Sequence, residues 1–130
     1  MNWRRLSLIA AALVLAILGI AATFFPDELL QRIGAGGNGV LPLLVQLMGA
    51  LYLAFAIQNW TAKDSLIGGI YNRPLALANL VHFVSGALAL AKGVSAHHDA
   101  RLLWPLTIVY WIFAAVFARI AFTSPVVTQE

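Results

Sequence analysis

The sequence predicts an all-α protein, an antiparallel four-helix transmembrane bundle that occupies residues 1–130 as a single domain. Hydrophobic residues make up 62% of the chain and charged residues only 10%, and the mean hydropathy is +0.87. A water-soluble core of this size cannot hide so much apolar surface, so we expect an integral membrane protein. Four long apolar runs, separated by polar connections, indicate how often the chain crosses the bilayer.

The expected spans cover residues 6–25, 40–57, 74–91 and 102–122. A helix rises about 1.5 Å per residue, so the third run covers roughly 27 Å, close to the thickness of a bilayer core. The first run follows Arg4 and Arg5 and resembles a signal peptide as well as a membrane helix. It is longer than the apolar part of a signal peptide and has no convincing small-x-small cleavage site, so we expect it to be retained.

The connections carry signals for helix starts and stops. Residues 26–33 place proline in a first turn and two acids at its positive dipole end, which predicts a short interfacial helix or an extension of the first span. The glycine-rich residues 34–39 predict a break, and residues 61–72 predict a loop. In the last connection, residues 92–101, Asp99 is expected to cap the final helix.

Charge decides the expected orientation. Four spans put both termini on one side, and the positive-inside rule then compares the two sides. Five basic residues share the side of the termini and three share the other, namely Arg4, Arg5, Lys63, Arg73 and Arg119 against Arg32, Lys92 and Arg101. We therefore expect a bacterial plasma membrane with both termini in the cytoplasm.

The first span carries a stripe of small residues, Ala12, Ala16 and Gly19, which would let a neighbouring backbone approach closely. We expect this stripe to pack against another helix. The alternative is that a span so rich in alanine shows such a stripe by chance.

The third span carries His82, and Asn79 lies three residues before it on the same helical face. At about 1.5 Å per residue, Gln46 of the second span and Tyr110 of the fourth can lie in the same layer as His82. Polar groups in lipid must find partners, so these side chains are expected to face one another. The candidate ligand-binding residues are His82, Asn79, Gln46, Tyr110 and Thr107.

Two interpretations of this polar layer stay open. It can form an intramembrane pocket for the headgroup of an amphiphile, or it can supply interhelical hydrogen bonds that fix the register of the helices. Either way we expect His82 to be buried, neutral and hydrogen-bonded to Gln46 or Tyr110, since an unpaired buried imidazole would cost about 1–3 kcal/mol.

Several kinds of chemistry find no residues to support them. The chain has no cysteine, and its carboxylates lie only at span ends, in connections or in the tail: Asp27, Glu28, Asp64, Asp99 and Glu130. This excludes thiol chemistry and a membrane-embedded carboxylate of the kind used by small four-helix multidrug exporters. No acid pair or nucleophile with a base is evident, so an enzyme is the less favoured reading.

We assign no metal and no cofactor. A membrane haem of the b type needs a second histidine facing His82, whereas His97 and His98 are adjacent in a connection. With Asp99 they would make at most a weak surface metal site. The eight basic residues are scattered and give no basic groove, which excludes nucleic acid as a partner.

The order of features resembles the DoxX-like group of small four-helix integral membrane proteins. The similarity rests on the arginine-led first span, on FFPDELL after it with Pro26, and on LMGALYLAFAIQNW with the turn Gly49–Tyr52. The segment YNRPLALANLVHF also looks like a family signature. The resemblance implies a four-helix membrane fold, and some members are linked with membrane oxidoreductase complexes or with sulfur and quinone metabolism.

For function we therefore expect a small membrane protein that binds a lipid, a quinone or another amphiphile in an intramembrane pocket. The alternative is a non-catalytic accessory subunit of a larger membrane complex, such as an oxidoreductase. The expected partners are the lipid bilayer, an amphiphilic ligand, and either another membrane protein or further copies of this chain.

Overall fold

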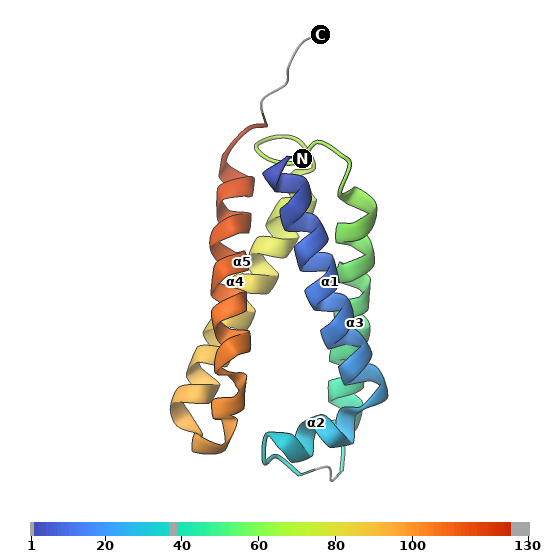
Figure 1. Cartoon of the computed structure of the whole chain (residues 1–130), viewed down its shortest axis with the longest axis vertical. Coiled ribbons are helices and arrows are strands. Elements are labelled where there is room, and N and C mark those ends of the chain that lie inside the picture. Colours follow the sequence, from blue (N-terminus) through green and yellow to red (C-terminus); the bar gives the residue numbers. More distant parts are fainter. Residues whose placement is uncertain (1, 37–38, 126–130) are drawn as a thin grey trace.

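A computed structural model describes residues 2–36 and 39–125 (Figure 1). Gly37 and Asn38 of the expected glycine-rich break lie outside the described residues, as does Glu130 of the tail. Within these ranges the chain is all-helical, and four of its helices are long and apolar enough to cross a membrane. The elements are α1 Trp3–Phe24, α2 Pro26–Arg32, α3 Leu41–Ala62, α4 Arg73–Ala96, the 3-10 helix η1 His98–Leu103 and α5 Trp104–Phe122.

Prolines mark the helix starts. Each of α2, α3, α4 and α5 has a proline in its first two positions, where the missing N–H leaves no hydrogen bond unmade. The short helix expected after the first span is confirmed as α2. The expected cap at Asp99 is wrong, because Asp99 lies inside η1 and α5 begins only at Trp104, next to Pro105.

Helices α1 and α3 form the first helix pair, which is packed through small residues. A Cβ atom at Gly49 would lie 2.5 Å from Thr23 Oγ1 and 2.8 Å from Thr23 N, so the backbone of α3 lies directly on α1. A Cβ at Gly19 would meet Leu53 of α3 at 2.8 Å. The expectation that Gly19 packs against a neighbouring helix is therefore confirmed.

Helices α4 and α5 form the second helix pair, which is packed through aromatic rings. Phe83 is fully buried and stacks on Phe113 and Phe117, with ring centroids 4.8 and 5.6 Å apart. The ring of Tyr110 lies on Gly86, where a Cβ would come within 2.5 Å of Tyr110 Cε1. Side-chain volume rather than backbone contact holds this pair together.

Polar contacts join the two pairs near the chain termini. Arg4 of α1 is 6% exposed, and its guanidinium donates to the carbonyls of Ile67, Thr123 and Ser124 and to Thr123 Oγ1 at 2.6–3.1 Å. The segment between α3 and α4 passes so close to Arg4 Nη1 that a Cβ at Gly68 would overlap it. Figure 1 shows the two pairs close together at this end and apart at the other, where α2 lies.

A reciprocal amide pair makes a second link. Asn59 of α3 and Asn79 of α4 are both fully buried, and each donates from Nδ2 to the other's Oδ1 at 2.8 Å. Asn79 also donates to the carbonyl of Leu75 at 3.0 Å. These bonds satisfy two side chains that could not otherwise be buried between apolar helices.

The outer surface of the four long helices is apolar. Large hydrophobic side chains are at least half exposed along each of them, among others Leu13, Ile17, Leu43, Leu47, Leu51, Val81, Leu88, Ile108 and Ile112. A patch this extensive is rare on a soluble monomer. It supports the expectation of an integral membrane protein.

Candidate functional site

The largest feature between the helix pairs is an apolar cavity of about 470 Å³. All six helical elements contribute to its wall. The lining residues are Leu18, Ala21, Ala22, Leu29, Leu30, Ile33, Val45, Met48, Tyr52, Gly86, Ala89, Leu90, Gly93, Leu103, Leu106 and Tyr110. The volume falls in the range of pockets that hold small organic ligands.

Helix α2 forms the floor of this cavity. Its Leu29, Leu30 and the following Ile33 face inward, while Asp27 and Glu28 are exposed. Just beyond α2, Gly34 lies against Asp99 of η1, so close that a Cβ there would be 3.2 Å from the Asp99 Cβ. The floor thus reaches from the first helix pair to the second.

The polar end of the cavity is formed by Tyr52, Tyr110 and the neighbouring His82. The Tyr110 hydroxyl lies 3.3 Å from His82 Nε2, a hydrogen bond whose donor depends on the imidazole tautomer. The imidazole stacks on Phe55 with centroids 4.8 Å apart and meets the edge of Tyr52 at 5.7 Å. The aromatic rings therefore fix the orientation of His82 beside the cavity.

The structure brings together only some of the predicted site residues. The expected hydrogen bond between His82 and Tyr110 is confirmed, although His82 is half-buried rather than buried. Asn79 is hydrogen-bonded to Asn59 and does not line the cavity. Thr107 is buried, and its hydroxyl donates to the carbonyl of Leu103 at 2.9 Å.

Gln46 does not reach His82, so Tyr110 rather than Gln46 is the partner of the imidazole, and the expectation that Gln46 faces the polar layer is wrong. Its Nε2 donates instead to the Thr23 carbonyl at 3.3 Å, and its side chain is exposed. The cause is the close packing of Gly49 of α3 against α1. The face of α3 that carries Gly49 is turned toward α1. Gln46 lies three residues earlier on nearly the same side, so it ends beside the last turn of α1.

Sequence reasoning missed two residues near the site. Asn59 and Tyr52 are not among the predicted site residues, and both appear only in the segment that carries the family resemblance. Tyr52, Ala56 and Asn59 recur at i, i+4 and i+7, a spacing that places them on one helical face. That spacing was the available signal that Asn59 faces the interior.

No group of three or more histidine, cysteine or acidic side chains that could hold a metal ion occurs within residues 2–36 and 39–125. His98 Nδ1 instead lies 2.8 Å from Arg101 Nη2. Comparisons with protein-family models, with curated proteins and with solved structures found no match to this chain.

Proposed function

We propose that this chain is an antiparallel four-helix transmembrane bundle that binds an amphiphile, such as a quinone or a neutral lipid, in the cavity between its helix pairs. The observation that carries the proposal is the apolar cavity of about 470 Å³ with the hydrogen-bonded Tyr110–His82 pair at one end. Ligand sites usually combine such an apolar wall with a few polar groups that orient the ligand.

The chemistry of the wall favours an uncharged headgroup. Among the described residues that line the cavity, none is charged. The Tyr52 and Tyr110 hydroxyls can donate to a ligand carbonyl or accept from a ligand hydroxyl. A phosphate at this depth would meet no cation, so a quinone or a lipid alcohol fits better than a phospholipid.

The proposal includes the membrane and the orientation in it. Trp3 and Trp60 lie half-exposed at the end of the molecule that carries both chain termini, and Trp104 lies half-exposed at the opposite end. Tryptophans at both ends are expected of a protein with two membrane interfaces. The distribution of basic residues favours cytoplasmic termini. The bacterial plasma membrane is the membrane proposed for the chain. Membership of the DoxX-like group is part of the same proposal and rests on the sequence resemblance.

The test is purification of the full chain in a mild detergent, followed by mass spectrometry of what is bound. We expect a neutral amphiphile at about one per chain. Tyr110→Phe keeps the ring and removes the hydroxyl, and it should lower retention roughly fivefold, the equivalent of a net hydrogen bond of about 1 kcal/mol. His82→Leu should fold and also lose the ligand.

The matched control is Gln46→Leu, which removes a polar side chain outside the cavity and should retain the amphiphile. Equal retention by Tyr110→Phe and the unmodified chain would contradict the proposed site. A stoichiometric protein in place of an amphiphile would favour the alternative, an accessory subunit of a larger complex.

A further inference from the structure

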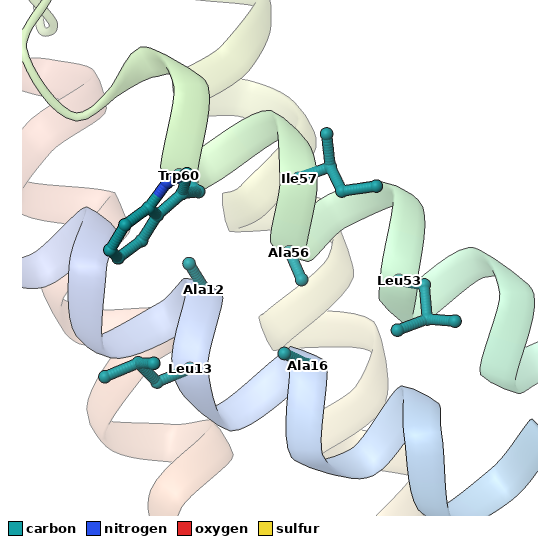
Figure 2. A pocket seen from close by; sticks show the side chains of 7 residues that line it. All are labelled: Ala12, Leu13, Ala16, Leu53, Ala56, Ile57 and Trp60. Atoms are coloured by element: carbon teal, nitrogen blue, oxygen red, sulfur yellow. The ribbon is translucent and has the colours of Figure 1, made fainter.

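The outer face of the first helix pair holds a second apolar hollow, a groove of about 350 Å³ between α1 and α3. Its floor is made of small side chains, Ala12, Ala16 and Ala56, and its rims of Leu13, Leu53, Ile57 and Trp60. In Figure 2, Ala16 and Ala56 face each other across the groove, and Trp60 reaches from α3 toward α1 at one end. The hollow is open to the surroundings of the protein.

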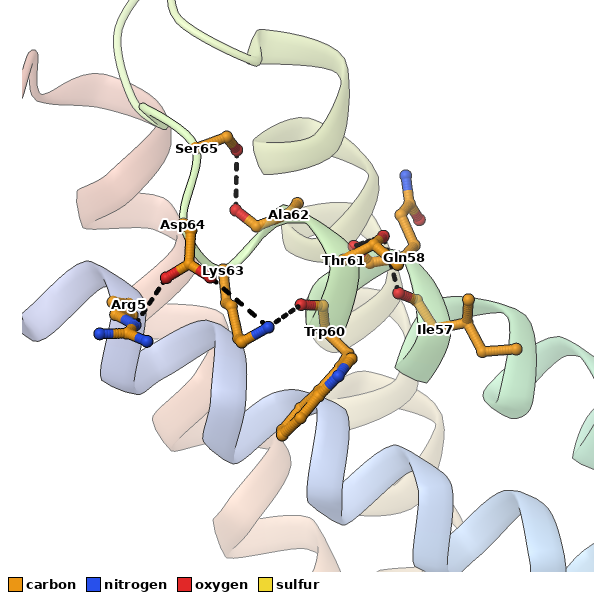
Figure 3. Close-up of polar contacts among 9 residues, drawn as sticks. All are labelled: Arg5, Ile57, Gln58, Trp60, Thr61, Ala62, Lys63, Asp64 and Ser65. Atoms are coloured by element: carbon orange, nitrogen blue, oxygen red, sulfur yellow. Dashed lines mark hydrogen bonds and ion pairs between the residues drawn. The ribbon is translucent and has the colours of Figure 1, made fainter.

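A small basic cluster lies directly beyond that end (Figure 3). Arg5 Nε is 2.8 Å from Asp64 Oδ1, and Lys63 Nζ is 3.5 Å from Asp64 Oδ2. Lys63 Nζ also lies 4.5 Å from the centroid of the Trp60 ring. Two cations thus share one carboxylate, which leaves the cluster with a net positive charge.

The whole end of the molecule that carries the chain termini is more basic than the opposite end. In the described part of the chain, the end of the termini carries five basic residues and one carboxylate, Asp64, whereas the opposite end carries three of each. The basic residues at the first end are Arg4, Arg5, Lys63, Arg73 and Arg119. An excess of this kind attracts anionic lipid headgroups at the membrane surface.

The cluster and the groove are in axial register. Lys63 follows Ile57 by six residues, about 9 Å along the axis of α3, with Trp60 halfway between them. A phosphate held at Lys63 would therefore place the ester groups of a phospholipid beside Trp60 and the start of an acyl chain in the groove.

From this geometry we infer an anionic phospholipid site on the first helix pair, with the phosphate held by Arg5 and Lys63 and one acyl chain lying between α1 and α3. The inference depends on the membrane insertion proposed above and not on the cavity between the pairs. Asp64 limits the affinity, because it competes with the phosphate for both cations.

The test measures phospholipid retention by native mass spectrometry on the full chain in detergent. Phosphatidylglycerol and phosphatidylcholine with identical acyl chains are added in equal amounts, and we expect phosphatidylglycerol to be retained in excess. Lys63→Gln and Arg5→Gln should each lower that retention about fivefold, the effect of one basic residue near a membrane surface. Asp64→Asn should raise it by a similar factor.

The matched control for charge is Lys92→Gln at the opposite end, which should leave retention unchanged. The control for the acyl chain is Ile57→Ala, which removes an exposed side chain from the rim of the groove and should lower retention without changing the melting temperature in phosphatidylcholine. Inorganic phosphate should not displace the lipid, since it has nothing to place in the groove.

Three results would overturn the site: equal retention of the two lipids, an equal loss in Lys92→Gln and Lys63→Gln, or displacement by inorganic phosphate. His82→Leu separates this site from the proposed function, because it should empty the cavity between the helix pairs and leave phosphatidylglycerol in place. Loss of both ligands in His82→Leu would contradict the independence of the two sites.

Discussion

The two helix pairs are packed in different ways. In the first pair, Gly19 and Gly49 bring the backbones of α1 and α3 into contact, while in the second pair Phe83 and its neighbours fill the space between α4 and α5 with rings. Both pairs nevertheless contribute to the polar end of the cavity. The second pair supplies Tyr110 and His82, and the first supplies Tyr52 together with Phe55, which stacks on the imidazole.

The largest expected effect is on the second pair, through Phe83→Ala. Removing a fully buried ring that stacks on two others should cost about 3–5 kcal/mol of unfolding free energy. Unfolding by a denaturing detergent, followed by circular dichroism, measures the difference. Phe122→Ala, which removes an equally large but 75% exposed ring from the same helix pair, should change stability far less.

The expected loss of unfolding free energy is smaller in the first pair, where the substitution adds volume instead of removing it. Gly49→Ala places a Cβ against the backbone of Thr23, which cannot yield without separating the helices, so we expect a loss of about 1–3 kcal/mol. The control is Gly93→Ala on α4, where a Cβ meets nothing within 4 Å. That substitution should stabilise by up to about 1 kcal/mol, from helix propensity alone. If the two substitutions had the same sign, the contrast between the pairs would be refuted.

The link between the pairs should show the weakest effect. A double-mutant cycle with Asn59→Leu and Asn79→Leu isolates the reciprocal amide pair, and we expect a coupling of about 0.6–1.7 kcal/mol, the range found for side-chain hydrogen bonds within membranes. Thermal unfolding of the two single variants and the double variant provides the measurement. A coupling of zero would mean that the pairs are held together at this level by apolar contact alone.

Sequence alone predicted the helices and one contact of the site. Apolar runs and first-turn prolines locate helices because both are local properties of the chain. The contact of His82 with Tyr110 could be predicted because depth in a membrane follows from residue count. The same reasoning fails for Gln46. Its depth in the membrane is suitable for a contact with His82, but the direction of its side chain depends on the packing of Gly49 and of α3 against α1.

The polar layer predicts an intramembrane pocket, but the position and the walls of the cavity could not be predicted from the sequence. The existence of the cavity depends on the separation of the helix pairs at the end of α2, and its floor on the contact of Gly34 with Asp99. Neither follows from residue spacing within one helix. Asn59 belongs to the same category, because an amide near a helix end suits an interface as well as a buried partner.

The Arg4 contacts also have a consequence for how the ends of α1 and α5 depend on each other. Thr123 and Ser124, which directly follow α5, supply three of the four acceptors, and the Ile67 carbonyl supplies the fourth. Because Arg4 is buried, a change that displaces Thr123 and Ser124 would leave guanidinium N–H groups without partners, at a cost of about 1–3 kcal/mol or more. The position of the last turn of α5 is thus coupled to the first turn of α1.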